Sequence, residues 1–81
     1  MRIISTTDIS RVVNGSTIYQ TLSLVEKLDV YSVISFMKII DYAGEVLKAE
    51  FSILDNTQNR EQAIYVYRHN GGKLDEAIFS N

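Results

Sequence analysis

Apolar side chains recur with the period of a helix in the first half of the chain. Ile18, Leu22, Val25 and Leu28 stand at i, i+4, i+7 and i+10, with polar residues mostly between them. This spacing predicts a helix over 16–28 with Ser16 at its N-terminal cap. Asn14-Gly15 is also a strong hairpin signal, and the Thr, Ile and Tyr residues after it favour strands. A strand over 18–25 therefore stays open as the alternative.

The next segment, 30–43, carries two stripes at helical spacing. Asp29 is placed to cap a helix and Gly44 to end it. The wider stripe should face the core and consists of Val30, Val33, Ile34, Met37 and Ile40. An amphipathic helix is normally polar on the opposite side, yet there the stripe is Tyr31, Ser35, Ile39 and Tyr42. That second stripe predicts either a contact surface or burial under the C-terminal strands.

Both ends of the chain predict shorter elements. We expect a strand over 2–5 and a short helix over 6–13. In the last third, Leu47, Ala49, Phe51 and Ile53 alternate with polar residues, which predicts a strand with those four side chains buried. A polar loop over 56–60, a strand over 63–68 and a turn at Asn70-Gly71-Gly72 should follow. The segment 74–79 is then either a third strand or a short helix.

Composition limits the classes of function. The 81 residues make one domain, 1–81, with a net charge of −2. No cysteine is present, which excludes disulfides and thiolate sites and suits the reducing cytoplasm. The sequence has no apolar run of the roughly 20 residues that a membrane span needs and no apolar leader. His69 has no partner pattern for a metal or a catalytic triad, so we expect no metal, no cofactor and no enzymatic activity.

The segments LSLVEKLDVYSVISFMKIIDYAGEV and KAEFSILDNTQNREQAIYVYR together resemble winged helix-turn-helix domains over residues 16–69. The resemblance rests on the apolar positions Val33, Met37 and Ile40, on the Ala43-Gly44 ending of the predicted helix and on the predicted strand, loop and strand that follow. The resemblance implies a small α+β, winged-helix-like domain. Two or three N-terminal helices would precede an antiparallel β-hairpin or a three-stranded meander.

The resemblance also implies a DNA-binding regulator of transcription that contacts double-stranded DNA. Helix 30–43 would enter the major groove, and the 55–61 wing loop would lie on the adjacent backbone. The candidate DNA-binding residues are Tyr31, Ser32, Ser35, Lys38, Tyr42, Asn56, Gln58, Asn59 and Arg60.

A protein partner is the alternative target. Exposed tyrosine and isoleucine favour association with protein over contact with DNA. The candidate interface residues are Tyr31, Ile39, Tyr42, Tyr65 and Tyr67, or an edge strand takes their place. In this hypothesis the chain is a small inhibitor or adaptor, and its use of Ile, Asn, Tyr and Ser fits an AT-rich genome or a phage. Under either hypothesis we expect a homodimer.

Overall fold

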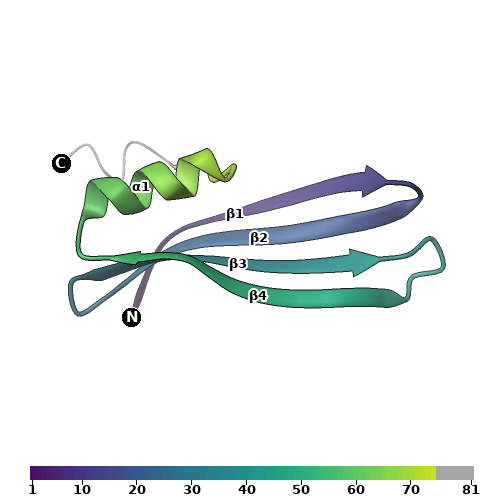
Figure 1. The fold of residues 1–81 in the computed structure, drawn as a ribbon, viewed down its shortest axis with the longest axis horizontal. Coiled ribbons are helices and arrows are strands. Elements are labelled where there is room, and N and C mark those ends of the chain that lie inside the picture. Colours follow the sequence, from purple (N-terminus) through teal and green to yellow (C-terminus); the bar gives the residue numbers. More distant parts are fainter. Residues whose placement is uncertain (75–81) are drawn as a thin grey trace.

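The computed structural model describes residues 1–74, which form a four-stranded antiparallel sheet and one helix (Figure 1). The strands are β1 (Arg2–Val13), β2 (Ser16–Lys27), β3 (Val30–Ile40) and β4 (Val46–Thr57). Each strand pairs with the next, so the order in the sheet is β1-β2-β3-β4. The helix α1 (Arg60–His69) follows β4. The strands are 11 or 12 residues long, which is about twice the usual length.

The strands are joined by turns that fix their register. Asn14-Gly15 connects β1 to β2 with positive φ at both residues, as a type I′ turn requires, and Val13 pairs with Ser16. Leu28-Asp29 connects β2 to β3 with the same signs of φ, and Lys27 pairs with Val30. Between β3 and β4, the Asp41 carboxylate accepts hydrogen bonds from the backbone of Ala43 and Glu45, both at 2.9 Å.

The core lies between α1 and one face of the sheet. Leu22, Leu24 and Val33 from the two central strands are fully buried there, together with Ala63 and Tyr67 of the helix. Ala63 and Tyr67 stand four residues apart and therefore share one side of α1. The Asn59 side chain caps the helix by accepting a hydrogen bond from the backbone N–H of Gln62.

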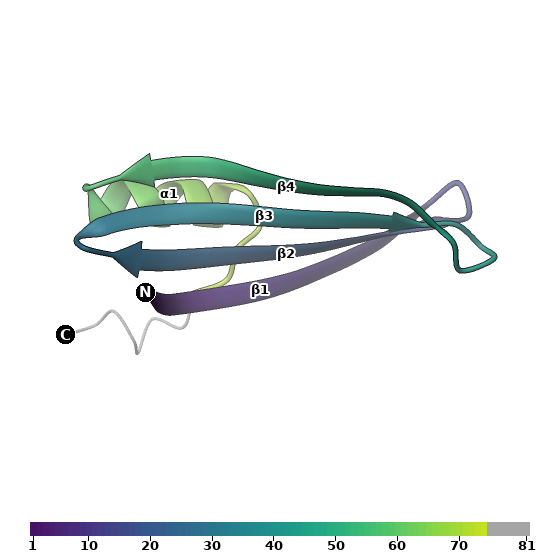
Figure 2. The ribbon, with the colours of Figure 1, turned by 90° about the horizontal axis from the view of Figure 1, so that it is seen from below.

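The helix covers only part of one face of the sheet. Ten helical residues span about 15 Å, whereas a strand of 12 residues spans about 40 Å. α1 lies over the end of the sheet that carries the N-terminus, and the hairpin tips at the other end extend well beyond it (Figures 1 and 2). The molecule is correspondingly elongated, at 45 × 22 × 18 Å.

The winged-helix-like fold class predicted from the sequence is wrong. The segments 6–13, 16–28 and 30–43, predicted as helices, belong to β1, β2 and β3, and the predicted strand 63–68 lies within α1. The alternative for the second segment, a hairpin at Asn14-Gly15 with a strand after it, is correct. The predicted strand over 47–53 is correct as well and lies within β4. Most of the segment 74–79 lies outside the described residues.

The errors have a common physical origin. A central strand whose two faces are both rich in apolar residues has no clean two-residue alternation, so helical spacings can be found in it by chance. β3 is such a strand: Val33 faces the helix and Ile34 faces the other way. No helix in the described part of the chain is long and apolar enough to cross a membrane.

Candidate protein-binding face

The face of the sheet that points away from α1 is built from alternate residues of the strands. Because Leu24 and Val33 pair across β2 and β3 and face the helix, their neighbours in sequence face the other way. Three rows of paired residues cross β2, β3 and β4 on that side. They are Ser23–Ile34–Ile53, Thr21–Phe36–Phe51 and Tyr19–Lys38–Ala49. We call these nine residues the open face.

The open face is strongly apolar and exposed. Phe51 is 62% exposed, Ile53 59%, Tyr19 47% and Phe36 46%. An aromatic side chain can bury roughly 150–250 Å², so each of the three aromatic residues offers about 100 Å² to a partner. With Ile53 and the neighbouring Val46, the exposed apolar area is on the order of 500 Å². A patch of that size on a monomer commonly marks a binding surface.

A shallow hollow lies over β2 and β3 on this side of the sheet. Its volume is about 290 Å³, and it is lined by Tyr19, Thr21, Phe36, Lys38 and Ile40. Lys38 is the charged member of the open face and stands between Tyr19 and Ala49 in its row. The hollow therefore combines an aromatic wall with a single positive charge. A complementary surface would present an apolar group and a carboxylate.

β4 adds a second feature, an open strand edge. β3 pairs with one side of β4, and no other described strand pairs with its outer side. Residues 46–51 are all exposed, and two register shifts interrupt the ladder with β3, one between Val33 and Ile34 near Leu54 and one between Ile39 and Ile40 that skips Leu47. An edge strand whose backbone groups are free can accept a further strand.

The structure disperses the residues predicted to contact DNA. Ser35 is buried on the face of the sheet that carries α1, and it accepts a hydrogen bond from Gln20 at 3.0 Å. Ser32 donates to the side chain of Asn56 at 2.9 Å across β3 and β4. Tyr42 is in the turn after β3, and Asn59 and Arg60 begin α1, with Gln58 just before them. Helix 30–43 and the 55–61 wing loop, which carried the DNA-binding mechanism, are a strand and a strand–helix junction.

The residues predicted for a protein interface do not form one stripe either. Tyr31 and Ile39 are on the helix side of β3, about 26 Å apart along the strand, and Tyr31 packs against the core. Tyr42 is 92% exposed in the turn. Tyr67 is fully buried in the core, and Tyr65 lies on the outer surface of α1, where its ring stacks on His69.

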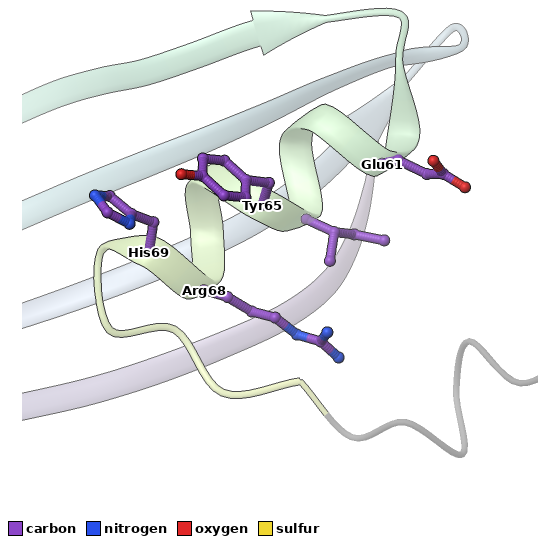
Figure 3. Close-up of a pocket in the computed structure, with 5 residues that line it drawn as sticks. Glu61, Tyr65, Arg68 and His69 are labelled. Atoms are coloured by element: carbon purple, nitrogen blue, oxygen red, sulfur yellow. The ribbon is translucent and has the colours of Figure 1, made fainter.

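A second concave region lies on the outer surface of α1. Its volume is about 430 Å³, and it is lined by Glu61, Ile64, Tyr65, Arg68 and His69 (Figure 3). In Figure 3, the Tyr65 and His69 side chains lie along one side of the helix, and Glu61 projects from its first turn. No group of three or more potential metal ligands occurs among residues 1–74. The region is a groove beside a short helix and has no recognisable catalytic arrangement.

Comparison with family models, with curated proteins and with solved structures finds no match to this chain.

The alternating pattern of β4 identifies two residues of the open face, but it predicts that they are buried. Phe51 and Ile53 were predicted to be the buried side of a strand, and both are more than half exposed. The helical spacing places Ile34 in the stripe expected to face the core, and it assigns Tyr19 and Phe36 to no surface. Only their cross-strand pairing brings them next to Phe51 and Ile53.

Proposed function

We propose that this protein is a non-enzymatic protein-binding module whose contact surface is the open face. The observation that carries the proposal is the set of exposed aromatic and aliphatic side chains on the side of the sheet opposite α1. Exposed aromatic residues gathered around a hollow are typical of binding hot spots. Absence of cysteine suits action in the reducing cytoplasm.

The chemistry of the open face defines the partner. The partner is a protein that offers a flat or slightly convex apolar surface, with an Asp or Glu positioned to reach Lys38. A stable complex buries roughly 800 Å² on each side, so the 500 Å² of apolar area would form the centre and surrounding polar residues the rim. Thr21 and Ser23 supply hydroxyls beside the apolar centre.

The winged-helix resemblance implies double-stranded DNA as the partner, and this stays a prediction. The helix that was expected to bind the DNA is strand β3 in the structure. Lys38 is flanked by apolar side chains, and the net charge of −2 opposes phosphate binding. A mobility-shift assay with duplex DNA at low salt serves as the counter-test. A salt-dependent shift that Lys38→Ala removes would favour DNA over protein as the target.

Site-specific photocrosslinking tests the proposed function. Benzoylphenylalanine replaces Phe36 in one variant and Tyr65 in another, both in cells that naturally carry the protein. Both positions hold exposed aromatic residues, so the exchange conserves size and character, and Tyr65 provides a matched control on the outside of α1. We expect a discrete crosslinked product with a second protein from position 36 and none from position 65.

Two results would contradict the proposal. One is the absence of any crosslinked product from position 36 while the variant is folded and abundant. The other is an equal set of products from both positions, which would indicate collision without recognition.

A further inference from the structure

The outer edge of β4 carries a charge pattern that is complementary to itself. Lys48 and Glu50 are two residues apart and therefore lie on the same face of the sheet, with Ala49 between them on the other. Their side chains form an ion pair, with Nζ and Oε2 3.2 Å apart, and both remain substantially exposed. Residues 46–53 contain no proline, so no residue that points its backbone toward the outer edge lacks the N–H that a new ladder needs.

We infer that β4 pairs antiparallel with β4 of a second copy of this chain, about a two-fold axis at Ala49. In this register Lys48 lies opposite Glu50 of the second copy, and Glu50 lies opposite its Lys48. The two intramolecular ion pairs are then replaced by two that cross the interface. Phe51, which is 62% exposed, comes close to Leu47 of the second copy, which is 60% exposed and is the residue that the ladder between β3 and β4 skips.

Charge selects this register over its neighbours. An axis at Lys48 would place the two Lys48 side chains opposite each other, and an axis at Glu50 would do the same with two carboxylates. Like charges directly opposite each other on neighbouring strands are destabilising. Of the three axes, at Lys48, Ala49 and Glu50, only the one at Ala49 places each charge opposite a charge of the other sign. The sequence of the strand therefore favours this register.

Geometry also permits this pairing. Ala49 pairs with Lys38 near the turn between β3 and β4, and the end of the sheet with this turn extends beyond α1 (Figure 2), so the two helices stay at opposite ends of the dimer. Because paired residues share a face, the axis is perpendicular to the sheet. Both helices then lie on one face of an eight-stranded sheet, and the two open faces join on the other.

The opposite edge, β1, is less suited to the same contact. Asp8 and Arg11 are three residues apart and point to opposite faces, so antiparallel pairing cannot place one opposite the other. Near its start, the Ser5 and Thr7 side chains are engaged by the backbone of Lys73. The complementary pattern is therefore a property of β4.

The proposed pairing uses the outer edge of β4, which also carries Ala49 and Phe51 of the open face, and its occupant is a second copy of this chain, so it goes beyond the proposed function. The variants distinguish a failure of the proposed function from a failure of the β4 pairing. Phe36, which tests the proposed function, is on an inner strand, whereas Lys48 and Glu50, which test the pairing, are on the edge strand.

Variants with exchanged charges, whose mass in solution is measured by light scattering, test the pairing. The wild-type chain of 9.2 kDa is expected to dimerise with concentration. Lys48→Glu and Glu50→Lys should each weaken dimerisation about tenfold or more, because every cross-strand attraction becomes a repulsion. The double variant K48E/E50K should restore the wild-type dimer. An equimolar mixture of the two single variants should form a heterodimer.

Disulfide trapping tests the register. The chain has no cysteine, so Ala49→Cys introduces a single thiol. Directly opposed residues have Cα atoms about 4.5–5.5 Å apart, within the range that a disulfide accepts. Ala49→Cys should crosslink rapidly on oxidation, while Ser10→Cys on β1 should not. A chain that stays monomeric at high concentration, or single charge variants that dimerise like wild type, or faster crosslinking of Ser10→Cys, would overturn the inference.

Discussion

At the scale of single residues, Tyr67 connects three parts of the molecule. Its ring is fully buried between α1 and the sheet. Its hydroxyl lies 2.6 Å from the Thr7 Oγ1 and 3.0 Å from the Ser5 Oγ, both on β1. Thr7 in turn accepts a hydrogen bond from the backbone N–H of Lys73 at 2.8 Å. One phenol thus links the helix, the first strand and the segment that follows the helix.

Removal of the Tyr67 hydroxyl should therefore destabilise the fold more than removal of an exposed one. Tyr67→Phe leaves the buried Thr7 hydroxyl without one of its partners, which costs about 1–3 kcal/mol in the free energy of unfolding. Tyr65→Phe, at a position that is 66% exposed, should change it by less than about 0.5 kcal/mol. Urea denaturation of both variants measures the difference. Equal stabilities would show that the hydroxyl cluster contributes nothing.

At the scale of elements, the two short hairpin turns differ in how well their residues suit them. Type I′ turns need positive φ at both central residues, for which Asn-Gly is favoured. The β1–β2 turn has this pair, but the β2–β3 turn places Leu28 at φ 51° and Asp29 at φ 63°. Leu28 is 88% exposed, so no packing offsets the unfavourable backbone conformation. This conformation costs a side chain such as leucine about 1–2 kcal/mol.

Substitution of Leu28-Asp29 by Asn-Gly should accordingly stabilise the protein by about 1–2 kcal/mol. The reciprocal change, Asn14→Leu, introduces leucine at the equivalent position of the first turn and should destabilise by a similar amount. Thermal unfolding of the two variants against wild type provides the measurement. If the Asn-Gly variant melts below wild type, the assignment of strain to Leu28 is wrong.

The sequence predicts the secondary structure of some of these elements correctly. Physical reasons explain why it predicts the wrong type for the others. β4 was found because polar and apolar residues alternate cleanly along it. β2 was mistaken for a helix although Thr17, Ile18 and Tyr19 favour strands and Asn14-Gly15 precedes them. Greater weight on turn chemistry would have corrected it. α1 was mistaken for a strand, yet Asn59 and Gln62 stand at the spacing of a helix cap and its reciprocal partner.

At the scale of the whole molecule, the exposed apolar surface follows from the placement of the single described helix. α1 packs on one face of the sheet, so within residues 1–74 no helix covers the opposite face with Phe36 and Phe51. Sequence patterns along single strands could not predict the open face, since apolar residues on either side of a strand are normally taken as core. The exposed positions emerge only once the place of α1 is known. Among the described residues, the outer edge of β4 pairs with no strand, and it borders the apolar open face.

The central claim, that the open face binds a protein, is tested most directly by the affinity of the crosslinked partner once it is purified. Titration calorimetry would compare the wild-type chain with Phe36→Asp and Tyr65→Asp. A charge introduced at a hot spot costs at least about 2 kcal/mol of binding free energy, or roughly 30-fold in Kd. We predict that Phe36→Asp loses at least this much while Tyr65→Asp binds like wild type. Unchanged affinity for Phe36→Asp, with the loss at Tyr65→Asp instead, would contradict the claim.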